Sequence, residues 1–417
     1  MTNIIEIDIG RTSPAWVAEL SKNDDGAPHA SLANTLIVMG CDPVLKGMVR
    51  WDDFAYRNMI SRAPPALHLE AGPAEGPYPR PITDEDVTAI QSYVQRVRGM
   101  RINQQTAQQA VEAIAQINKF HPVREYLNGL VWDGVERLDK WVSIAFGTPQ
   151  DAYHAAVGRK WLCGAERRVR VPGCKFDSVP VLEGPQGIGK TASLAALGGS
   201  EWYSDDMPKN LSDRDAAMAL HGVWIMEMSE LASIVRTNNE DVKSFITRCS
   251  DHYRPVYGKL FIDRLRQSIL TATTNETDWL RDTTGNRRYW PITCTRAEAM
   301  WIAENRDQLW AEAVMMEPDE PLWLDLESLR ATATEYQNDR LVEDAWQDRV
   351  EAYCSTRSQV KAADILQHGM GLSIDKQDRR AMIRIADILR CMGWTRRKVR
   401  SIENPSKIRW FWVSEKT

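Results

Sequence analysis

Hydrophobic runs from Lys175 onward are short, and they alternate with longer segments that repeat apolar residues at helical spacing. The short runs read "SVPVLE", "EWYS", "GVWIME", "QSILTATT" and "RYWPIT". Strands interleaved with helices favour a largely parallel sheet that is covered on both faces. We therefore predict an α/β core over residues 175–316.

The residues ahead of this core predict a mainly helical domain. Residues 82–174 contain "DEDVTAIQSYVQRVRG" and "NQQTAQQAVEAIAQINK", which repeat apolar positions at helical spacing, and two or three further helices that end near Arg170. Residues 62–81 are dense in Pro, Gly and Ala, which is typical of a linker or long loop. Residues 1–61 are expected to form a small unit whose class the pattern does not define.

The end of the chain predicts a winged helix. Residues 317–343 include "EPDEPL", which interrupts the pattern and indicates a linker. Residues 344–417 follow the order of three helices and two strands, with "VKAADILQHGM" and "DKQDRRAMIRIADILRCMG" as the second and third helices. The strands "TRRKVRS" and "SKIRWFWV" flank the turn-rich "IENP" and predict a β-hairpin.

Composition narrows the class of protein. The chain has 417 residues, 43% hydrophobic and 26% charged, which is ordinary for a soluble protein of two or three domains. Its seven cysteines form no CxxC motif, which argues against a zinc site and for a reducing compartment. No signal peptide or membrane-spanning run is visible, so we expect a cytoplasmic location. The net charge is −5, yet residues 390–417 carry eight basic and two acidic residues, a local surface suited to phosphate contacts.

A glycine-rich loop supplies the first candidate chemistry. It follows the strand "SVPVLE", precedes the helical "TASLAALGG" and matches the P-loop pattern GxxxxGK[ST]. Backbone N–H groups of such a loop surround phosphate oxygens, Lys190 would contact the β- and γ-phosphates, and Thr191 would offer its hydroxyl to Mg²⁺. The expected ATP-binding residues are Gly184, Pro185, Gln186, Gly187, Ile188, Gly189, Lys190 and Thr191.

Polar residues at the ends of later strands complete this candidate site. The strand in "HGVWIMEMSEL" ends at Glu227, expected with Thr191 to hold Mg²⁺ partly through water, and Glu230 follows; which of the two acids polarises the attacking water stays open. Asn275 follows the strand "SILTATT" and would sense the γ-phosphate. Arg287 and Arg288 precede the last strand, and either can stabilise the transferring phosphoryl group. The alternatives are solvated surface acids and arginines paired within their own subunit.

Seven segments together carry a resemblance to a known family: "FHPVREYLNGLVWDG", "VGRKW", "LEGPQGIGKT", "EWYSDD", "HGVWIMEMSEL", "YRPVYGK" and "TTNETDWLRDTTGNRRYWP". They resemble the virulence-associated protein E family of phages and genomic islands, which is similar to superfamily 3 helicases and to the helicase half of phage primase–helicases. The resemblance is strong over Phe120–Thr293 and weak outside it. It implies an AAA+-like core with a five-stranded sheet, working as a ring, usually a hexamer. Nucleotide would lie between subunits, with Arg287, rather than Arg288, reaching in from the neighbour.

The resemblance also implies a hairpin that grips single-stranded DNA in the ring channel. Its tip would be Tyr257-Gly258-Lys259, where Lys259 neutralises a phosphate, with Arg254, Arg264 and Arg266 near its base. The alternative for Lys259 taken alone is an exposed lysine in a turn.

The winged helix offers further DNA contacts. Basic residues on its third helix, expected at 375–393, would face DNA, and others would decorate the wing. These residues are Arg379, Arg380, Arg384, Arg396, Arg397, Lys398 and Arg400. Trp410, Phe411 and Trp412 are expected to pack the hairpin onto the helices rather than to stack on bases. Winged helices also bind proteins, which is the alternative here.

These elements together predict an ATP- and Mg²⁺-dependent DNA helicase or translocase in phage or mobile-element replication. Residues 1–170 show neither a zinc ribbon nor an acidic polymerase pattern, and the acids of "WDDF" are expected to be surface structure. If the chain is complete, priming would come from a separate protein or would not occur. The alternatives are a nucleotide-gated regulatory or phage-interference module that does not unwind DNA and, less favoured, a small-molecule kinase.

Overall fold

The computed structural model describes residues 14–66, 76–255, 260–280, 285–342, 344–400 and 408–414. The chain forms two compact units, Met1–Gly129 and Leu130–Thr417. Within the described part of the chain, no helix combines the length and the apolar character that crossing a bilayer requires.

The first unit packs helices against a small sheet of order β3-β2-β1-β4. Strand β1 pairs antiparallel with β2 and parallel with β4. Its elements are η1 (Ala15–Glu19), α1 (Leu32–Cys41), β1 (Val49–Asp52), β2 (Arg57–Ile60), β3 (Arg80–Pro81), α2 (Asp84–Arg98), α3 (Gln104–Ile117), β4 (Lys119–Phe120) and α4 (Pro122–Gly129). Helix α2 begins where Thr83 and Asp86 form a capping box and ends at Gly99, which is left-handed.

This unit differs from the expected division at residues 61 and 81. Val38 of α1, Val49 of β1, Ile90 of α2 and Val111 of α3 belong to one buried core, so the segments on both sides of the predicted linker fold together. The end of that linker is itself strand β3, which pairs with β2. Of the predicted linker, residues 67–75 lie outside the described residues, and composition carried no information about the core that the segments on either side share.

The second unit is built on five parallel strands in the order β11-β5-β10-β7-β6, which confirms the predicted parallel sheet in a mixed α/β fold. Every residue of β5, β7 and β10 is buried. The strands are β5 (Val179–Glu183), β6 (Tyr203–Ser204), β7 (Ile225–Met228), β10 (Ile269–Thr274) and β11 (Tyr289–Thr293). The hairpin of β8 (Ser250–Tyr253) and β9 (Ile262–Leu265) is separate from this sheet.

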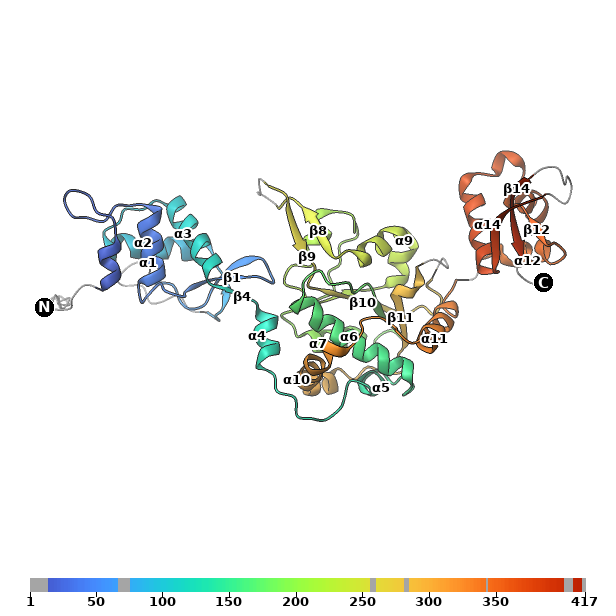
Figure 1. The fold of residues 1–417 in the computed structure, drawn as a ribbon, viewed down its shortest axis with the longest axis horizontal. Helices are drawn as coiled ribbons and strands as arrows, with labels where there is room; N and C mark the ends of the chain where they lie inside the picture. Colours follow the sequence, from blue (N-terminus) through green and yellow to red (C-terminus); the bar gives the residue numbers. More distant parts are fainter. Residues whose placement is uncertain are drawn as a thin grey trace. The chain divides into compact units, whose positions relative to one another are not determined.

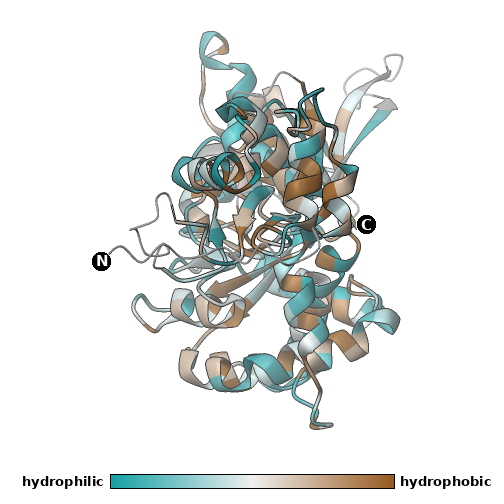
Figure 2. Ribbon diagram, turned by 90° about the vertical axis from the view of Figure 1, so that its left-hand side faces the viewer, coloured by the Kyte–Doolittle hydropathy of each residue, from teal (hydrophilic) through white to brown (hydrophobic). Residues whose placement is uncertain are grey.

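Helices cover both faces of the sheet (Figure 1). The covering elements are α5 (Trp141–Phe146), α6 (Ala152–Arg170), α7 (Lys190–Gly198), α8 (Arg214–Met218), α9 (Leu231–Thr247), η2 (Asn286–Arg288), α10 (Ala299–Met316), η3 (Glu317–Asp319) and α11 (Glu327–Asn338). On one face, Trp224 stacks on Trp310 of α10 at 4.0 Å between ring centroids and donates to Ala165 O of α6 (2.9 Å). On the other, Phe245 of α9 packs with Met226 and Leu270. The helices carry both hydrophobic and hydrophilic residues (Figure 2).

Two segments that were predicted to lie outside the α/β core belong to it. Helices α5 and α6 were expected in the helical domain 82–174, yet α6 packs against the sheet. Helix α11 lies in the predicted linker 317–343, and Gln337 on it donates to Tyr289 O of β11 (2.8 Å). An amphipathic helix buries its apolar face against whichever surface the fold presents, and its position along the chain does not name that surface.

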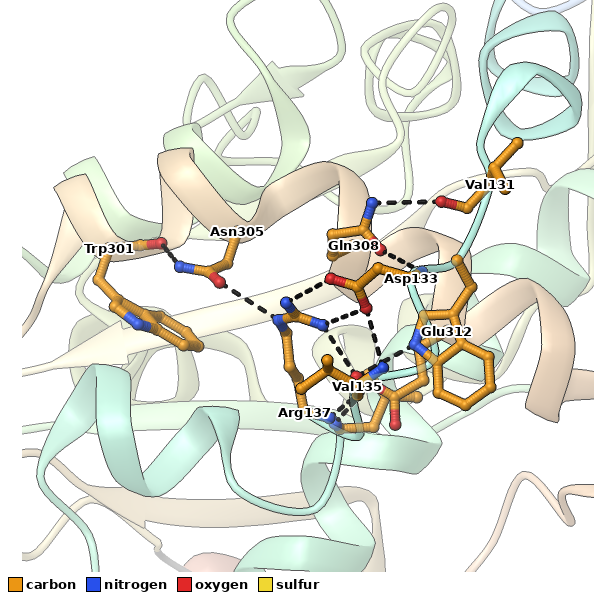
Figure 3. Close-up of polar contacts among 10 residues, drawn as sticks. Val131, Asp133, Val135, Arg137, Trp301, Asn305, Gln308 and Glu312 are labelled. Carbon is orange, nitrogen blue, oxygen red and sulfur yellow. Dashed lines mark hydrogen bonds and ion pairs between the residues drawn. The ribbon is translucent and has the colours of Figure 1, made fainter.

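The segment leading into α5 is fastened to α10 by side chains on that helix (Figure 3). Gln308 donates to Val131 O (3.2 Å) and accepts from Asp133 N (2.9 Å). Glu312, which is 2% exposed, accepts from Arg137 N (2.7 Å), and Arg137 pairs with Asp133 (2.7 Å). Burial raises the pKa of Glu312 because it disfavours the charged carboxylate. The hydrogen bonds from backbone N–H groups offset part of this cost of burial. The extended segment therefore has a defined path without strand pairing.

The C-terminal residues of the second unit follow the predicted order of three helices and a hairpin. The elements are α12 (Gln347–Cys354), β12 (Gln359–Val360), α13 (Ala362–Asp364), the π-helical turn η4 (Ile365–Gly369), η5 (Ile374–Lys376), α14 (Arg379–Cys391), β13 (Trp394–Arg400) and β14 (Ile408–Ser414). The antiparallel sheet has the order β12-β14-β13. The third helix begins at Arg379 rather than at Asp375, because Asp378 caps it by accepting from Ala381 N (2.7 Å).

Candidate functional site

The ends of three neighbouring strands bring the candidate site residues together. Strands β5, β10 and β7 are parallel and adjacent, so the residues at their carboxyl ends meet at one edge of the sheet. Gly184 follows β5, Asn275 follows β10 and Glu227 lies near the end of β7. In open α/β sheets, this edge is where ligands bind.

The loop from Gly184 to Gly189 has the backbone that its glycines permit. Gly184, Gly187 and Gly189 have φ values of 156°, 80° and 100°, which side chains rarely adopt. At Gly184 a Cβ atom would also lie 2.5 Å from Cys294 O, so the position excludes larger residues by space as well. Gly189 immediately precedes α7, and the helix amino terminus therefore opens at this loop. A loop of this form offers backbone N–H groups to an anion.

Lys190 is the first residue of α7, and its ammonium group donates three hydrogen bonds. Nζ donates to Gly184 O (2.7 Å), Pro185 O (2.9 Å) and Asn275 Oδ1 (2.8 Å). The residue is 7% exposed, and burial lowers its pKa. The Lys190–Asn275 bond joins two residues that the sequence assigned to one site although 85 positions separate them.

Glu227 is the centre of a buried hydrogen-bond network. The residue is 0% exposed, and Oε1 accepts from the hydroxyls of Thr191 (3.0 Å), Thr273 (2.5 Å) and Ser229 (3.2 Å). Oε2 accepts from the Tyr203 hydroxyl (2.5 Å). The contact between Thr191 and Glu227 places together the two oxygen ligands that were expected to hold Mg²⁺, a cation that prefers such donors.

Tyr203 is a member of this network that the sequence analysis missed. It lies on β6, which pairs with β7 at the edge of the sheet. Burial and the bond to Glu227 raise the pKa of Tyr203, so the hydroxyl stays a donor. The only signal was its place in the family segment "EWYSDD", because a tyrosine on a short strand is ordinary core material.

Glu230 is arranged quite differently from Glu227. It is exposed, has a left-handed backbone (φ 54°) and immediately precedes α9. Its side chain forms no hydrogen bond or ion pair with any other described residue. The Glu227 carboxylate is therefore buried and accepts hydrogen bonds from four hydroxyls, whereas the Glu230 carboxylate is exposed to solvent.

A second buried carboxylate, also missed from the sequence, lies directly behind the loop. Glu183 ends β5 and is 5% exposed. It accepts from the Trp279 indole (2.6 Å), from Arg340 Nη2 (2.8 Å) and from the Thr293 hydroxyl (3.2 Å). Arg340 comes from the segment expected to be a linker, so no local pattern pointed to this pair.

Arg287 and Arg288 precede β11 and so lie at the amino-terminal ends of the strands, opposite to the carboxyl ends where the loop lies. Strand β11 runs from Tyr289 beside Val179 to Thr293 beside Glu183, and four strand residues span about 13 Å. Arg288 donates to Thr247 Oγ1 (3.0 Å) and Gly285 O (3.2 Å). Arg287 is exposed and makes no hydrogen bond or ion pair with another described residue.

The structure separates the candidate residues of the β8–β9 hairpin. The predicted tip, Tyr257-Gly258-Lys259, lies outside the described residues. Arg254 is exposed and Arg264 is half-buried. Arg266 is 5% exposed and donates to both carboxylate oxygens of Asp251 (2.7 and 2.8 Å), which is incompatible with its predicted DNA contact.

An aromatic pair on the same hairpin escaped the sequence analysis. Phe261 is 64% exposed and stacks on His252, with ring centroids 5.2 Å apart and ring planes within 5°. An exposed phenylalanine beside basic residues is a surface on which a base can stack.

Most of the basic candidate residues within 344–417 have exposed side chains. Those with exposed side chains are Arg379, Arg380, Arg396, Arg397 and Lys398. Arg384 instead pairs with Asp344 (2.8 Å) and lies 4.0 Å from the ring centroid of Trp346, so its predicted DNA contact has a competing partner. The side chain of Arg400 lies outside the described ones. Of the three aromatic residues expected to pack the hairpin, Phe411 and Trp412 are buried, but Trp410 is 51% exposed.

Comparison with known proteins places the core of the chain in a family. Residues 127–342 match the virulence-associated protein E-like domain, and because this is more than half of the 417 residues, the chain belongs to that family. No curated protein matches the chain. Among solved structures it is similar to an apo structure of the NrS-1 C-terminal region at 13% identity, covering 88% of this chain and 95% of that one with a TM-score of 0.47. An A-form apo structure of the same region is 14% identical, covers 69% and 78%, and has a TM-score of 0.40.

Proposed function

We propose that the chain is an ATP-dependent motor on DNA that works as a ring, a helicase or translocase in the replication of a phage or mobile element. The observation that carries the proposal is the convergence of Lys190, Asn275, Thr191 and Glu227 beside a glycine loop that opens a helix. Membership of the virulence-associated protein E-like family and its resemblance to superfamily 3 helicases support the choice of a DNA motor over other nucleotide-binding proteins.

Triphosphate and Mg²⁺ fit the residues present. The Lys190 ammonium is held on two backbone carbonyls and one amide oxygen, neutral acceptors that a polyphosphate can replace with stronger, charge-assisted bonds. Thr191 and Glu227 offer the hydroxyl and carboxylate oxygens that Mg²⁺ prefers. When bound there, the cation stabilises the charge that develops on the phosphoryl oxygens.

Different surroundings assign the two acids to different tasks. Glu227 is buried and already accepts four hydrogen bonds, which suits a fixed carboxylate that orients the shell of a metal ion. Glu230 is exposed at the same edge of the sheet, and its carboxylate forms no hydrogen bond or ion pair with another described residue. These surroundings suit a group that orients the attacking water and accepts its proton. We therefore assign the water-orienting role to Glu230.

Arg287 is suited to act on the nucleotide of a neighbouring subunit. It precedes Tyr289, which lies about 13 Å back along β11 from Thr293 beside Glu183. Arg288 donates hydrogen bonds to Thr247 and Gly285 of its own chain. Arg287 is exposed and forms no hydrogen bond or ion pair with another described residue. A ring in which each interface pairs the loop edge of one subunit with the Arg287 edge of the next uses both features.

DNA would be held by the β8–β9 hairpin. Arg254 and the stacked Phe261 are exposed next to the segment that contains Lys259. Phosphate neutralisation together with base stacking gives a grip that does not depend on sequence, as a motor requires. ATP binding and hydrolysis at the interfaces would move these hairpins and draw one strand through the ring.

Mixing two inactive variants tests the shared interface directly. Lys190→Ala and Arg287→Ala chains should each lose ATP hydrolysis, and a mixture should regain part of it, because some interfaces then combine an intact loop with an intact Arg287. Arg101→Ala is the matched control, since Arg101 is exposed in the first unit and forms no described ion pair. Failure of the mixture to recover activity, with each variant folded, would exclude a shared site.

The DNA motor is tested on a forked duplex. The intact chain should hydrolyse ATP faster with single-stranded DNA present and should separate the fork, and Lys259→Ala should keep basal hydrolysis while losing both effects. Hydrolysis by a single subunit that ignores DNA would instead favour a nucleotide-gated regulatory module.

A further inference from the structure

The β13–β14 hairpin of the C-terminal domain has one face that combines cations and tryptophans. In its antiparallel register, Arg396 lies opposite Trp412, and Lys398 lies opposite Trp410. Side chains two positions apart on a strand share a face, so these four residues lie on the same side of the hairpin.

The two tryptophans have different surroundings. Trp412 is 6% exposed and belongs to the core that includes Ile385 and Leu389 of α14. Trp410 is 51% exposed and is absent from that core. Trp412 therefore attaches the hairpin to the helices, and Trp410 does not. The ring of Trp410 is therefore accessible to a partner, and tryptophan is enriched at binding interfaces.

Two cations lie over the exposed ring. The Arg396 guanidinium carbon and Lys398 Nζ each lie 5.3 Å from the ring centroid of Trp410. Both side chains are exposed, and neither forms an ion pair with an acid among the described residues. Arg396, Lys398 and Trp410 thus present an aromatic surface with two positive charges, and no acidic side chain among the described residues neutralises them.

We propose that Arg396, Lys398 and Trp410 form a binding site for an unpaired nucleotide of single-stranded DNA. The base stacks on Trp410, and the phosphates on either side of it contact the two cations. This site rests on the proposed function in one respect, that DNA is the partner. It is separate from the ring channel and from ATP hydrolysis.

Single-stranded DNA fits this site better than a duplex does. In a duplex each base is covered by its neighbours and presents only its edges in the grooves. The face of Trp410 can therefore be used only where a base is unstacked, whereas the cations alone would bind either form of DNA. A strand leaving the fork provides such bases.

The test compares fluorescently labelled oligo-dT with a blunt duplex, using the full chain without nucleotide. To separate this site from the motor, every variant also carries Lys190→Ala. Trp410→Ala should weaken oligo-dT binding about five- to 150-fold, the range found for removing one base-stacking aromatic, and should leave duplex binding nearly unchanged. Trp410→Phe should restore most of the affinity. Trp323→Ala is the matched control, because Trp323 is 63% exposed outside this domain.

Salt dependence distinguishes stacking from charge. Lys398→Ala and Arg396→Ala should each lower the slope of log affinity against log salt by about 0.7 on oligo-dT, whereas Trp410→Ala should change affinity and not slope. Equal loss on oligo-dT and duplex, or no loss on either, would overturn the site. If the chain with Lys190 intact failed to separate a fork while Trp410→Ala still weakened oligo-dT binding, the motor would be excluded and the site retained.

Discussion

Tyr203→Phe removes one hydroxyl from the network around Glu227 and leaves the ring in place. That hydroxyl provides the only hydrogen bond that Oε2 receives from the described residues, at 2.5 Å, whereas Oε1 receives three. Because Glu227 is 0% exposed, Oε2 has no ready replacement from solvent. The substitution therefore leaves one oxygen of the carboxylate proposed to orient the metal without a hydrogen-bond donor among the described residues.

The magnitude follows from the charge of the acceptor. A hydrogen bond to a charged group contributes about 1.5–3 kcal/mol, and leaving a buried acceptor without its donor forfeits that amount. For a cooperative unit of this size, the loss corresponds to a midpoint about 3–12 °C lower. Tyr336→Phe is the matched control, because it removes a hydroxyl for which the described residues offer no hydrogen bond.

Calorimetry measures the stability, and hydrolysis at varied Mg²⁺ measures the function. In Tyr203→Phe, we expect the Mg²⁺ concentration for half-maximal hydrolysis to rise and the binding of metal-free nucleotide to stay unchanged, since Lys190 and the loop are intact. A variant as stable as the intact chain with an unaltered Mg²⁺ requirement would refute the reasoning that the fold positions Glu227 through Tyr203.

Two further predictions concern other buried ionisable groups. Arg340→Met leaves Glu183 buried without its cation and should cost about 3–5 kcal/mol in urea unfolding, of which adding Glu183→Gln should recover part; equal stability of the two variants would contradict this. Burial and the nearby Arg264 lower the pKa of His221 to about 4, and His221 shares a hydrogen bond with the Tyr253 hydroxyl (2.7 Å). Between pH 6.5 and pH 4 the unfolded chain therefore binds a proton at His221 that the folded chain does not. The free energy of unfolding should fall as the pH drops through that window. The urea midpoint of His221→Gln should depend less on pH over the same range.

Much of the site is visible in local patterns. A glycine loop between an apolar strand and a helix is a contiguous segment, and its glycine positions follow from the backbone that the loop needs. The acid and the amide at strand ends follow from strand periodicity combined with the parallel arrangement, which brings the carboxyl ends of neighbouring strands to one edge. Lys190, Glu227 and Asn275 could therefore be assigned to one edge before any coordinates, while their roles remain predictions.

Other features depend on which surfaces face each other. Arg266 and Arg254 are similar in sequence context, yet one is buried on Asp251 and the other is exposed. Trp410 and Trp412 lie two positions apart on one face of a strand, and only one reaches the core. Periodicity identifies the face of an element, but it does not say how far the neighbouring layer extends over it.

The sequence alone therefore determined the class of this chain: an α/β core with a glycine-rich loop, its polar strand ends and its family. Only the tertiary structure decided that α6 and α11 complete the core, that Arg340 compensates Glu183 across 157 positions, and that Tyr203 holds Glu227. The physical reason is the range of the interactions. Backbone preferences and spacing act over a few residues, whereas burial and ion pairing depend on which distant segments the packing brings together.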